Sequence, residues 1–268
     1  MKKSDDHLND FDDAGGITFE VVESEAIDGQ RQVRKGVYLV PNLITTASML
    51  CAFFSIVASS EGAYYKAALA IFLSAVLDGM DGRAARILNA QSPFGEQFDS
   101  LADCIAFGLA PAMLVYQFAL HDLGRFGLAC AFVFTACAAF RLARFNVQIG
   151  EVDKKYFIGL ASPLAAILLA SSVMVAIDHA DWLGSVGNNI GVAEFAFAAW
   201  VVICGLLMVS NVKYYSFKEF DRQKVPFVAL IIGVLVMGAV LYDLPVGILA
   251  IGIIYALSGF VTTFKAKR

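Results

Sequence analysis

Long apolar stretches alternate with short polar segments along most of the chain. Eight of these stretches approach the length of about 20 residues that an α-helix needs to cross the hydrocarbon core of a membrane. They lie at about 43–60, 63–77, 101–120, 126–145, 158–177, 192–209, 225–241 and 246–264. The pattern predicts an all-α fold, a polytopic membrane bundle of about eight transmembrane helices.

The composition agrees with a membrane protein and excludes an ordinary soluble domain. Hydrophobic residues make up 59% of the chain and charged residues 16%, whereas soluble domains have about 45–50% and about 25%. All five cysteines fall in apolar segments without a CxxC pair, which predicts small core residues and not disulfides or metal ligands. We expect membrane lipids as surroundings and no nucleic acid as a partner.

The acidic residues are concentrated at the start of the chain. Nine of the 24 precede Val37, in a segment with few large apolar side chains, which is typical of a flexible tail. We therefore expect three parts: an acidic cytoplasmic tail over residues 1–33, a membrane core over 34–224, and a transmembrane hairpin over 225–268.

The basic residues predict the orientation in the membrane, because lysine and arginine favour cytoplasmic loops. With the N-terminus inside, 18 of the 20 fall in cytoplasmic segments, and only Lys66 and Arg125 fall outside. This predicts a multi-pass protein of the cell (inner) membrane with both termini in the cytoplasm. The polar segment between the second and third apolar stretches then also faces the cytoplasm.

That segment carries four aspartates next to apolar sequence. Asp78 and Asp81 are three residues apart, and Asp99 and Asp103 are four apart, so each pair shares one helical face. One charged side chain at the centre of a membrane helix costs roughly 2.5–3.5 kcal/mol, and neighbouring carboxylates also repel one another. The cluster therefore predicts a bound cation, and its oxygen ligands suit Mg²⁺, Mn²⁺ or Ca²⁺.

Residues that follow Asp78 on its helix suit a phosphate-containing ligand. Gly82 has no Cβ and Ala85 is small, so a bulky ligand can approach the backbone there. Arg86 lies two helical turns beyond Asp78 and offers forked donors to a phosphate. This helix face combines metal-binding carboxylates, small residues that leave room for a ligand, and an arginine that can bind an anion. A nucleotide diphosphate requires all three.

Polar residues at the start of the first apolar stretch lie at the same membrane depth as the aspartates. Asn42 and Thr45 are the candidates there for contact with such a ligand. Helix capping and hydrogen bonding between helices explain them equally well. Both interpretations stay open at this point.

The spacing of the motif from Asp78 to Asp103 resembles a known signature. It agrees at every specified position with D-x2-DG-x2-AR-x8-G-x3-D-x3-D, the signature of the CDP-alcohol phosphatidyltransferases. The resemblance implies six core helices, a pair of divalent metal ions (Mg²⁺ or Mn²⁺) at the cytoplasmic interface, and homodimeric assembly. It also implies transfer of a phosphatidyl group from a CDP-linked lipid to an alcohol, with release of CMP.

The resemblance also implies roles for individual residues. The metal ligands would be Asp78, Asp81, Asp99 and Asp103. Asp103 would also be the general base for the attacking hydroxyl, and the CDP moiety would be held by Gly82, Ala85 and Arg86. These roles are chemically reasonable, because metal ions stabilise a leaving phosphate and a carboxylate can deprotonate an alcohol.

Two further stretches bear on the acceptor alcohol. Residues 141–146 (RLARFN) and 157–163 (FIGLASP) look like the phosphatidylserine synthase branch of the family, which implies CDP-diacylglycerol and L-serine as substrates. Arg141 or Arg144 would bind the serine carboxylate, and Asn146 or Ser162 the ammonium or hydroxyl group. The alternative is that the two arginines only mark the cytoplasmic membrane boundary.

Three other functions compete with this interpretation. The same reaction with glycerol phosphate, inositol phosphate or another alcohol is the first; a phosphorylated acceptor favours extra basic residues near the metals, and the modest set in this chain favours serine. Intramembrane prenyltransferases also use aspartate clusters with Mg²⁺, but they lack the DG-x2-AR core. A cation-coupled transporter would have two repeated halves, and the stretch 78–103 is not repeated later in the chain.

Overall fold

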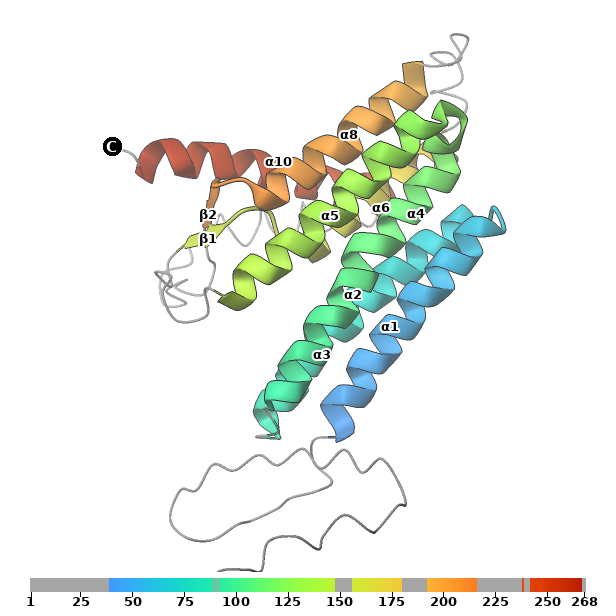
Figure 1. Ribbon diagram of the computed structural model, residues 1–268. Helices are drawn as coiled ribbons and strands as arrows, with labels where there is room; N and C mark the ends of the chain where they lie inside the picture. Colours follow the sequence, from blue (N-terminus) through green and yellow to red (C-terminus); the bar gives the residue numbers. More distant parts are fainter. Residues whose placement is uncertain are drawn as a thin grey trace, which may run out of the picture. The chain divides into compact units, whose positions relative to one another are not determined.

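The computed structural model describes residues 39–88, 90, 92–147, 156–179, 192–215, 238 and 242–266. The helices of the first half are α1 (Leu39–Ser60), α2 (Tyr64–Ile87), α3 (Pro93–Asp103), α4 (Ala110–Val115) and α5 (Arg125–Val147). The later helices are α6 (Ser162–Asp178), α8 (Val192–Val209) and α10 (Leu244–Ala266). Short strands β1 (Tyr156–Ile158) and β2 (Lys213–Tyr215) lie between them (Figure 1).

The described residues confirm the all-α polytopic class. Five helical stretches among them are long and apolar enough to cross a membrane: Leu39–Ser60, Pro93–Leu123, Arg125–Val147, Val192–Val209 and Leu244–Thr263. Helix α6 is apolar and shorter, and α2 has 24 residues and carries the first half of the aspartate motif. The expected tail and nearly all of the expected span at 225–241 lie outside the described residues, so the count of eight spans stays a prediction.

Helices α1 and α2 pack closely because their facing residues are small. Ala52, Ala67 and Ala68 are fully buried, and small side chains let two helix backbones approach in a membrane. A reciprocal serine pair joins the same two helices: Ser48 Oγ donates to the Ser74 carbonyl at 2.9 Å, and Ser74 Oγ donates to the Ser48 carbonyl at 3.0 Å. This contact fixes α2 beside α1 one turn before Asp78.

The third spanning stretch begins earlier than the apolar pattern indicates, already at Pro93. Ser92 caps the helix by accepting a hydrogen bond from the Gly95 N–H at 3.0 Å, and Pro93 suits the first turn because its missing N–H has no helical partner there. The stretch changes after Asp103 into π-helices η1 (Cys104–Leu109) and η2 (Tyr116–Leu120), with α4 between them, and ends in the 3-10 helix η3 (His121–Leu123). The second half of the motif thus lies inside a continuous helical span.

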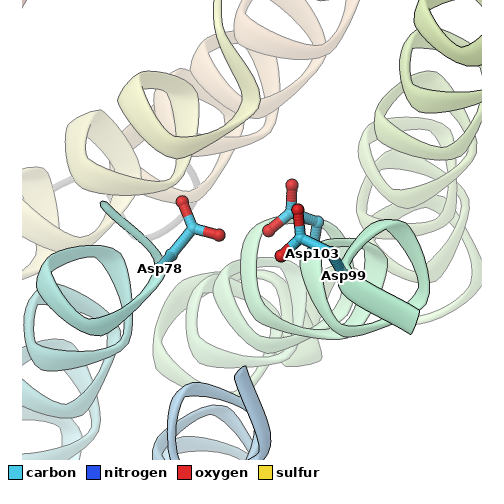
Figure 2. Close-up of side chains that lie close together, drawn as sticks. All are labelled: Asp78, Asp99 and Asp103. Carbon is cyan, nitrogen blue, oxygen red and sulfur yellow. The ribbon is translucent and has the colours of Figure 1, made fainter. Parts of the chain in front are cut away.

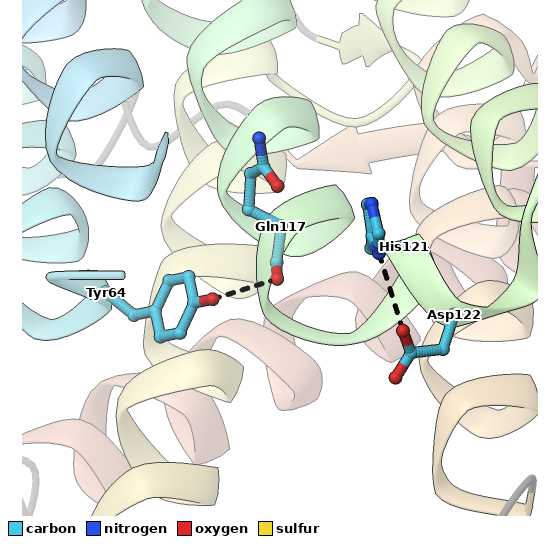
Figure 3. Close-up of polar contacts among 4 residues, drawn as sticks. All are labelled: Tyr64, Gln117, His121 and Asp122. Atoms are coloured by element: carbon cyan, nitrogen blue, oxygen red, sulfur yellow. Dashed lines mark hydrogen bonds and ion pairs between the residues drawn. The ribbon is translucent and has the colours of Figure 1, made fainter. Parts of the chain in front are cut away.

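The end of this stretch is attached to the start of α2. The Tyr64 hydroxyl donates to the Gln117 carbonyl at 3.0 Å (Figure 3). Two turns closer to the middle of α2, Ile71 is fully buried in the common core. His121 lies nearby with Nδ1 3.4 Å from Asp122 Oδ1, and both side chains are exposed.

The apolar pattern was wrong about the start of the fifth stretch, which it places at residue 158. Ile158 belongs to β1, and α6 begins only at Ser162. Gly159 has φ +80°, which interrupts a helix, and Pro163 stands in the first turn of α6. Strand β1 pairs antiparallel with β2, with Ile158 opposite Lys213.

Candidate active site

The two halves of the aspartate motif meet between α2 and α3. Asp78 comes from α2, and Asp99 and Asp103 come from one face of α3 (Figure 2). One carboxylate oxygen from each of the three lies within 4.8 Å of the others. We call these residues the aspartate trio. Figure 2 shows their carboxylates turned towards one another.

The aspartate trio fits a hard divalent cation. Asp99 Oδ1 is buried and has no hydrogen-bond partner among the described residues, and a buried charged oxygen without a partner is costly. Three carboxylates this close also repel one another. A cation with oxygen ligands would satisfy Asp99 and neutralise the cluster.

Asp81 is the predicted ligand that the structure does not bring into the aspartate trio. Its side chain is only 4% exposed, and Oδ2 accepts a hydrogen bond of 2.7 Å from the Thr45 hydroxyl on α1. Asp81 nevertheless lines a cleft that Asp99 also lines. The fourth carboxylate is therefore next to the trio and oriented by α1.

This cleft has a volume of about 170 Å³ and is formed by α1, α2 and the start of α3. It brings together all five residues predicted to contact a CDP-linked lipid: Asn42, Thr45, Gly82, Ala85 and Arg86. The other lining residues are Pro41, Asp81, Ala90, Ser92, Gly95, Glu96 and Asp99. We call it the α1–α2–α3 cleft.

Two glycines shape the α1–α2–α3 cleft in different ways. A Cβ built on Gly82 would be 3.8 Å from Arg86 Nη2, an ordinary contact, so the space above Gly82 is open to a ligand. A Cβ on Gly95 would be 3.1 Å from Ser92 Oγ and 3.4 Å from Asn42 Oδ1. The tight distance is to Ser92, the cap of the same helix, and the distance to Asn42 of α1 is an ordinary contact, so Gly95 leaves room for the Ser92 cap at the edge of the cleft. The Arg86 Nε group donates to the Gly82 carbonyl at 3.0 Å, which holds the side chain along its own helix.

Two of the predicted acceptor-binding residues, Arg141 and Ser162, contact each other directly. Arg141 Nη1 of α5 donates to Ser162 Oγ, at the start of α6, at 2.8 Å. The guanidinium group lies close enough to Asp103 for a charge interaction. Its Nε is buried and has no partner among the described residues. A buried donor without a partner, beside a carboxylate, suits an anionic group of a ligand.

The other two predicted acceptor residues have structural partners. Arg144 Nη2 donates to Asn211 Oδ1 at 3.0 Å, beyond the end of α8. Asn146 Nδ2 donates to Ser100 Oγ on α3 at 3.0 Å. Arg144 and Asn146 therefore connect α5 to its neighbours. Of the four residues predicted to bind the acceptor, only Arg141 and Ser162 contact each other.

Comparison with known proteins agrees with this geometry. Residues 38–200 match the family model described as CDP-alcohol phosphatidyltransferase, which includes the aspartate trio and the α1–α2–α3 cleft. The chain belongs to the CDP-alcohol phosphatidyltransferase family.

Three relatives named CDP-diacylglycerol–serine O-phosphatidyltransferase are similar to this family member. The protein from Helicobacter pylori strain 26695 is 37% identical over 195 residues, 73% of this chain and 79% of its own length. The protein from Bacillus subtilis strain 168 is 34% identical over 186 residues, 69% of this chain and 94% of its own length. The protein from Methanocaldococcus jannaschii is 35% identical over 144 residues, 54% of this chain and 61% of its own length.

Membership makes the chain a transferase of a family that depends on divalent metal ions, and the aspartate trio is the matching cluster. Sequence reasoning missed several residues around this cluster. Ser92 was detectable, because a serine directly before proline is a typical helix start. Asn211, the partner of Arg144, carries no local signal, since the two are 67 residues apart in the chain.

Proposed function

We propose that this CDP-alcohol phosphatidyltransferase is a phosphatidylserine synthase. It transfers the phosphatidyl group of CDP-diacylglycerol to the hydroxyl group of L-serine and releases CMP. Family membership and relatives at 34–37% identity support the reaction. The observation that carries the proposal is the aspartate trio, whose Asp103 also interacts electrostatically with Arg141.

The CDP moiety binds in the α1–α2–α3 cleft. Gly82 and Ala85 leave room for the ligand, and Arg86 supplies donors for the diphosphate. Asn42 and Thr45 add polar groups from α1. The alternative role of Thr45 in hydrogen bonding between helices is also realised, because it donates to Asp81.

The metal ligands in this proposal are Asp78, Asp81, Asp99 and Asp103, which would hold two ions of Mg²⁺ or Mn²⁺. Such ions would neutralise the diphosphate and stabilise the leaving CMP. Thr45 orients Asp81 towards the same centre through their hydrogen bond. The unpartnered Oδ1 of Asp99 supports a ligand role for that residue.

Asp103 is the general base. It accepts the proton of the serine hydroxyl, and the hydroxyl oxygen attacks the phosphorus atom that carries the diacylglycerol. The bond from this phosphorus to the oxygen of CMP breaks, so one P–O bond forms and one is lost. Arg141 binds the serine carboxylate through its free Nε, and Ser162 fixes the guanidinium group. The acceptor hydroxyl is thereby held beside its base.

The reaction takes place at the cytoplasmic face of the cell (inner) membrane, with both termini in the cytoplasm. The distribution of 18 of the 20 basic residues supports this orientation. In this proposal residues 34–224 form the catalytic core, residues 225–268 a C-terminal hairpin, and the protein works as a homodimer. With the site on the cytoplasmic side, serine can enter it directly from the cytoplasm, and CMP can leave into the cytoplasm.

The test is an acceptor screen with the purified protein, CDP-diacylglycerol, and Mg²⁺ or Mn²⁺. We expect labelled serine to enter phosphatidylserine with one CMP released per lipid formed. Asp103→Asn should abolish turnover, since general bases contribute about 10²–10⁴ in rate, while CDP-lipid binding largely survives. Use of glycerol phosphate or inositol phosphate in place of serine would contradict the assignment of the acceptor.

A further inference from the structure

The partners of Arg141 and Arg144 lie close in sequence to the β1–β2 ribbon. Strand β1 ends at Ile158, and only three residues separate it from Ser162, the partner of Arg141. Strand β2 begins two residues after Asn211, the partner of Arg144. The segments next to the two strands therefore hold α5 at two points.

The connection between the ribbon and Ser162 has little freedom to move. The Gly159 N–H donates to the Val212 carbonyl at 2.9 Å, and the Leu160 N–H donates to the Leu207 carbonyl at 3.0 Å. Gly159 also has φ +80°, and a Cβ there would lie 3.2 Å from the Ser210 carbonyl oxygen. A displacement of the segment around β2 is therefore passed on to the start of α6.

Helix α10 is attached to this ribbon through β2 (Figure 1). The Tyr214 hydroxyl donates to the Ala256 carbonyl at 3.3 Å, and the Lys213 N–H donates to Thr263 Oγ1 at 2.8 Å. Thr262 Oγ1 donates to the Lys213 carbonyl. Burial raises the pKa of Tyr214 to about 12, so its hydroxyl stays protonated as a donor. These contacts extend over about two turns of α10.

Two glycines allow α10 to lie this close. A Cβ on Gly259 would be 2.6 Å from Tyr214 Cζ and 2.7 Å from Val212 Cγ1. A Cβ on Gly252 would be 3.2 Å from Leu168 Cγ of α6. Both distances at Gly259 are too short for non-bonded carbon atoms, and an aromatic ring in a filled core cannot bend away. A side chain at Gly259 must therefore separate α10 from β2.

We propose that α10 positions the acceptor pocket, and that Tyr214 and Gly259 are positioning residues for serine. The inference rests on the proposed function. Tyr214 and Gly259 act on Arg141 through β2, β1 and Ser162, and they do not touch the reacting atoms. The α1–α2–α3 cleft is built from other helices, so binding of the CDP-lipid should not depend on them. This gives the C-terminal helix a role in one substrate site and not in the other.

The test measures both substrate constants in three variants: Gly259→Ala, Tyr214→Phe and Thr263→Val. We expect the KM for serine to rise about two- to tenfold in each, the factor that corresponds to one net hydrogen bond. The KM and the calorimetric Kd for CDP-diacylglycerol should stay unchanged. Ala250→Val is the matched control, because it enlarges a side chain at an exposed position of the same helix.

Each outcome decides the inference. An unchanged serine KM in folded variants, or an equal rise of both KM values, overturns it, since a purely structural role would act on both sites. If Gly259→Ala does not fold, Thr263→Val decides, because it removes one hydroxyl at nearly constant shape. If the wild type rejects serine and uses another alcohol, the proposed function fails. The same comparison with that alcohol then tests the role of α10 separately.

Discussion

Asp78 and Asp81 are three residues apart on α2 and have different partners. Asp78 faces Asp99 and Asp103, whereas Asp81 is buried and accepts the hydroxyl of Thr45. A hydrogen bond to a carboxylate in a buried site is stronger than one between neutral groups. At the scale of single residues, Thr45 therefore determines where the Asp81 carboxylate points.

Replacing Thr45 with valine keeps the shape of the side chain and removes the donor. The buried Asp81 carboxylate then loses a hydrogen bond to a charged group, worth about 1.5–3 kcal/mol. We expect the metal concentration for half-maximal activity to rise at least about tenfold, measured by Mn²⁺ titration of CMP release. Thr45→Ser keeps the hydroxyl and should remain close to the wild type. An unchanged metal dependence in Thr45→Val would exclude this role.

At the scale of elements, the two ends of α3 have separate functions. Its start is brought against α1 at Gly95 and Asn42, which closes the α1–α2–α3 cleft. Its end passes into the π-helix η1 directly after Asp103, and π-helical segments within α-helices are frequent at functional sites. There Thr135 Oγ1 of α5 donates to the Gly108 carbonyl at 3.3 Å. Helix α5 carries Arg141 two turns later, so this crossing keeps Asp103 and Arg141 in register.

Gly95→Ala tests the start of α3. Alanine is the better helix former by about 1 kcal/mol, so a defect would come from the tight contact of its Cβ with the capping hydroxyl of Ser92, which lines the cleft. We expect the affinity for CDP-diacylglycerol to fall about tenfold, as for a contact worth about 1.4 kcal/mol, measured by calorimetry. Gln97→Ala, at an exposed position of the same helix, is the control. Wild-type affinity in Gly95→Ala would show that the start of α3 relieves this contact without affecting the cleft.

At the scale of the whole molecule, the functional residues gather at one end of the helical unit. They lie near the start of α1, the end of α2, along α3, near the end of α5 and at the start of α6. Away from these residues, a polar contact joins the end of α6 to the residue before α10: His179 Nε2 lies 3.1 Å from Asp243 Oδ2. The start of one helix lies beside the end of another at this site, so parts of the chain that are far apart in the sequence meet there.

Because the aspartate trio and the cleft lie within residues 39–266, the acidic tail over residues 1–33 should not be needed for the transferase reaction. We expect a variant that lacks residues up to about Gln30 to keep the kcat and both KM values of the full chain. The measurement is steady-state kinetics in the same lipid mixture, with thermal unfolding as the control for folding. Loss of activity in a folded truncation variant would mean that the acidic tail contributes to the reaction.

The sequence alone determined the membrane class and the family signature, and it also predicted the shared face of Asp99 and Asp103. These features depend on composition and on the 3.6-residue period of one helix. Only the tertiary structure decided that Asp81 turns to Thr45, and that Arg141 and Ser162 form one pair while Arg144 turns to Asn211. It also decided that α10 holds the β1–β2 ribbon. The physical reason is that helical spacing orients a side chain on its own helix, whereas its partner depends on packing between segments far apart in the chain.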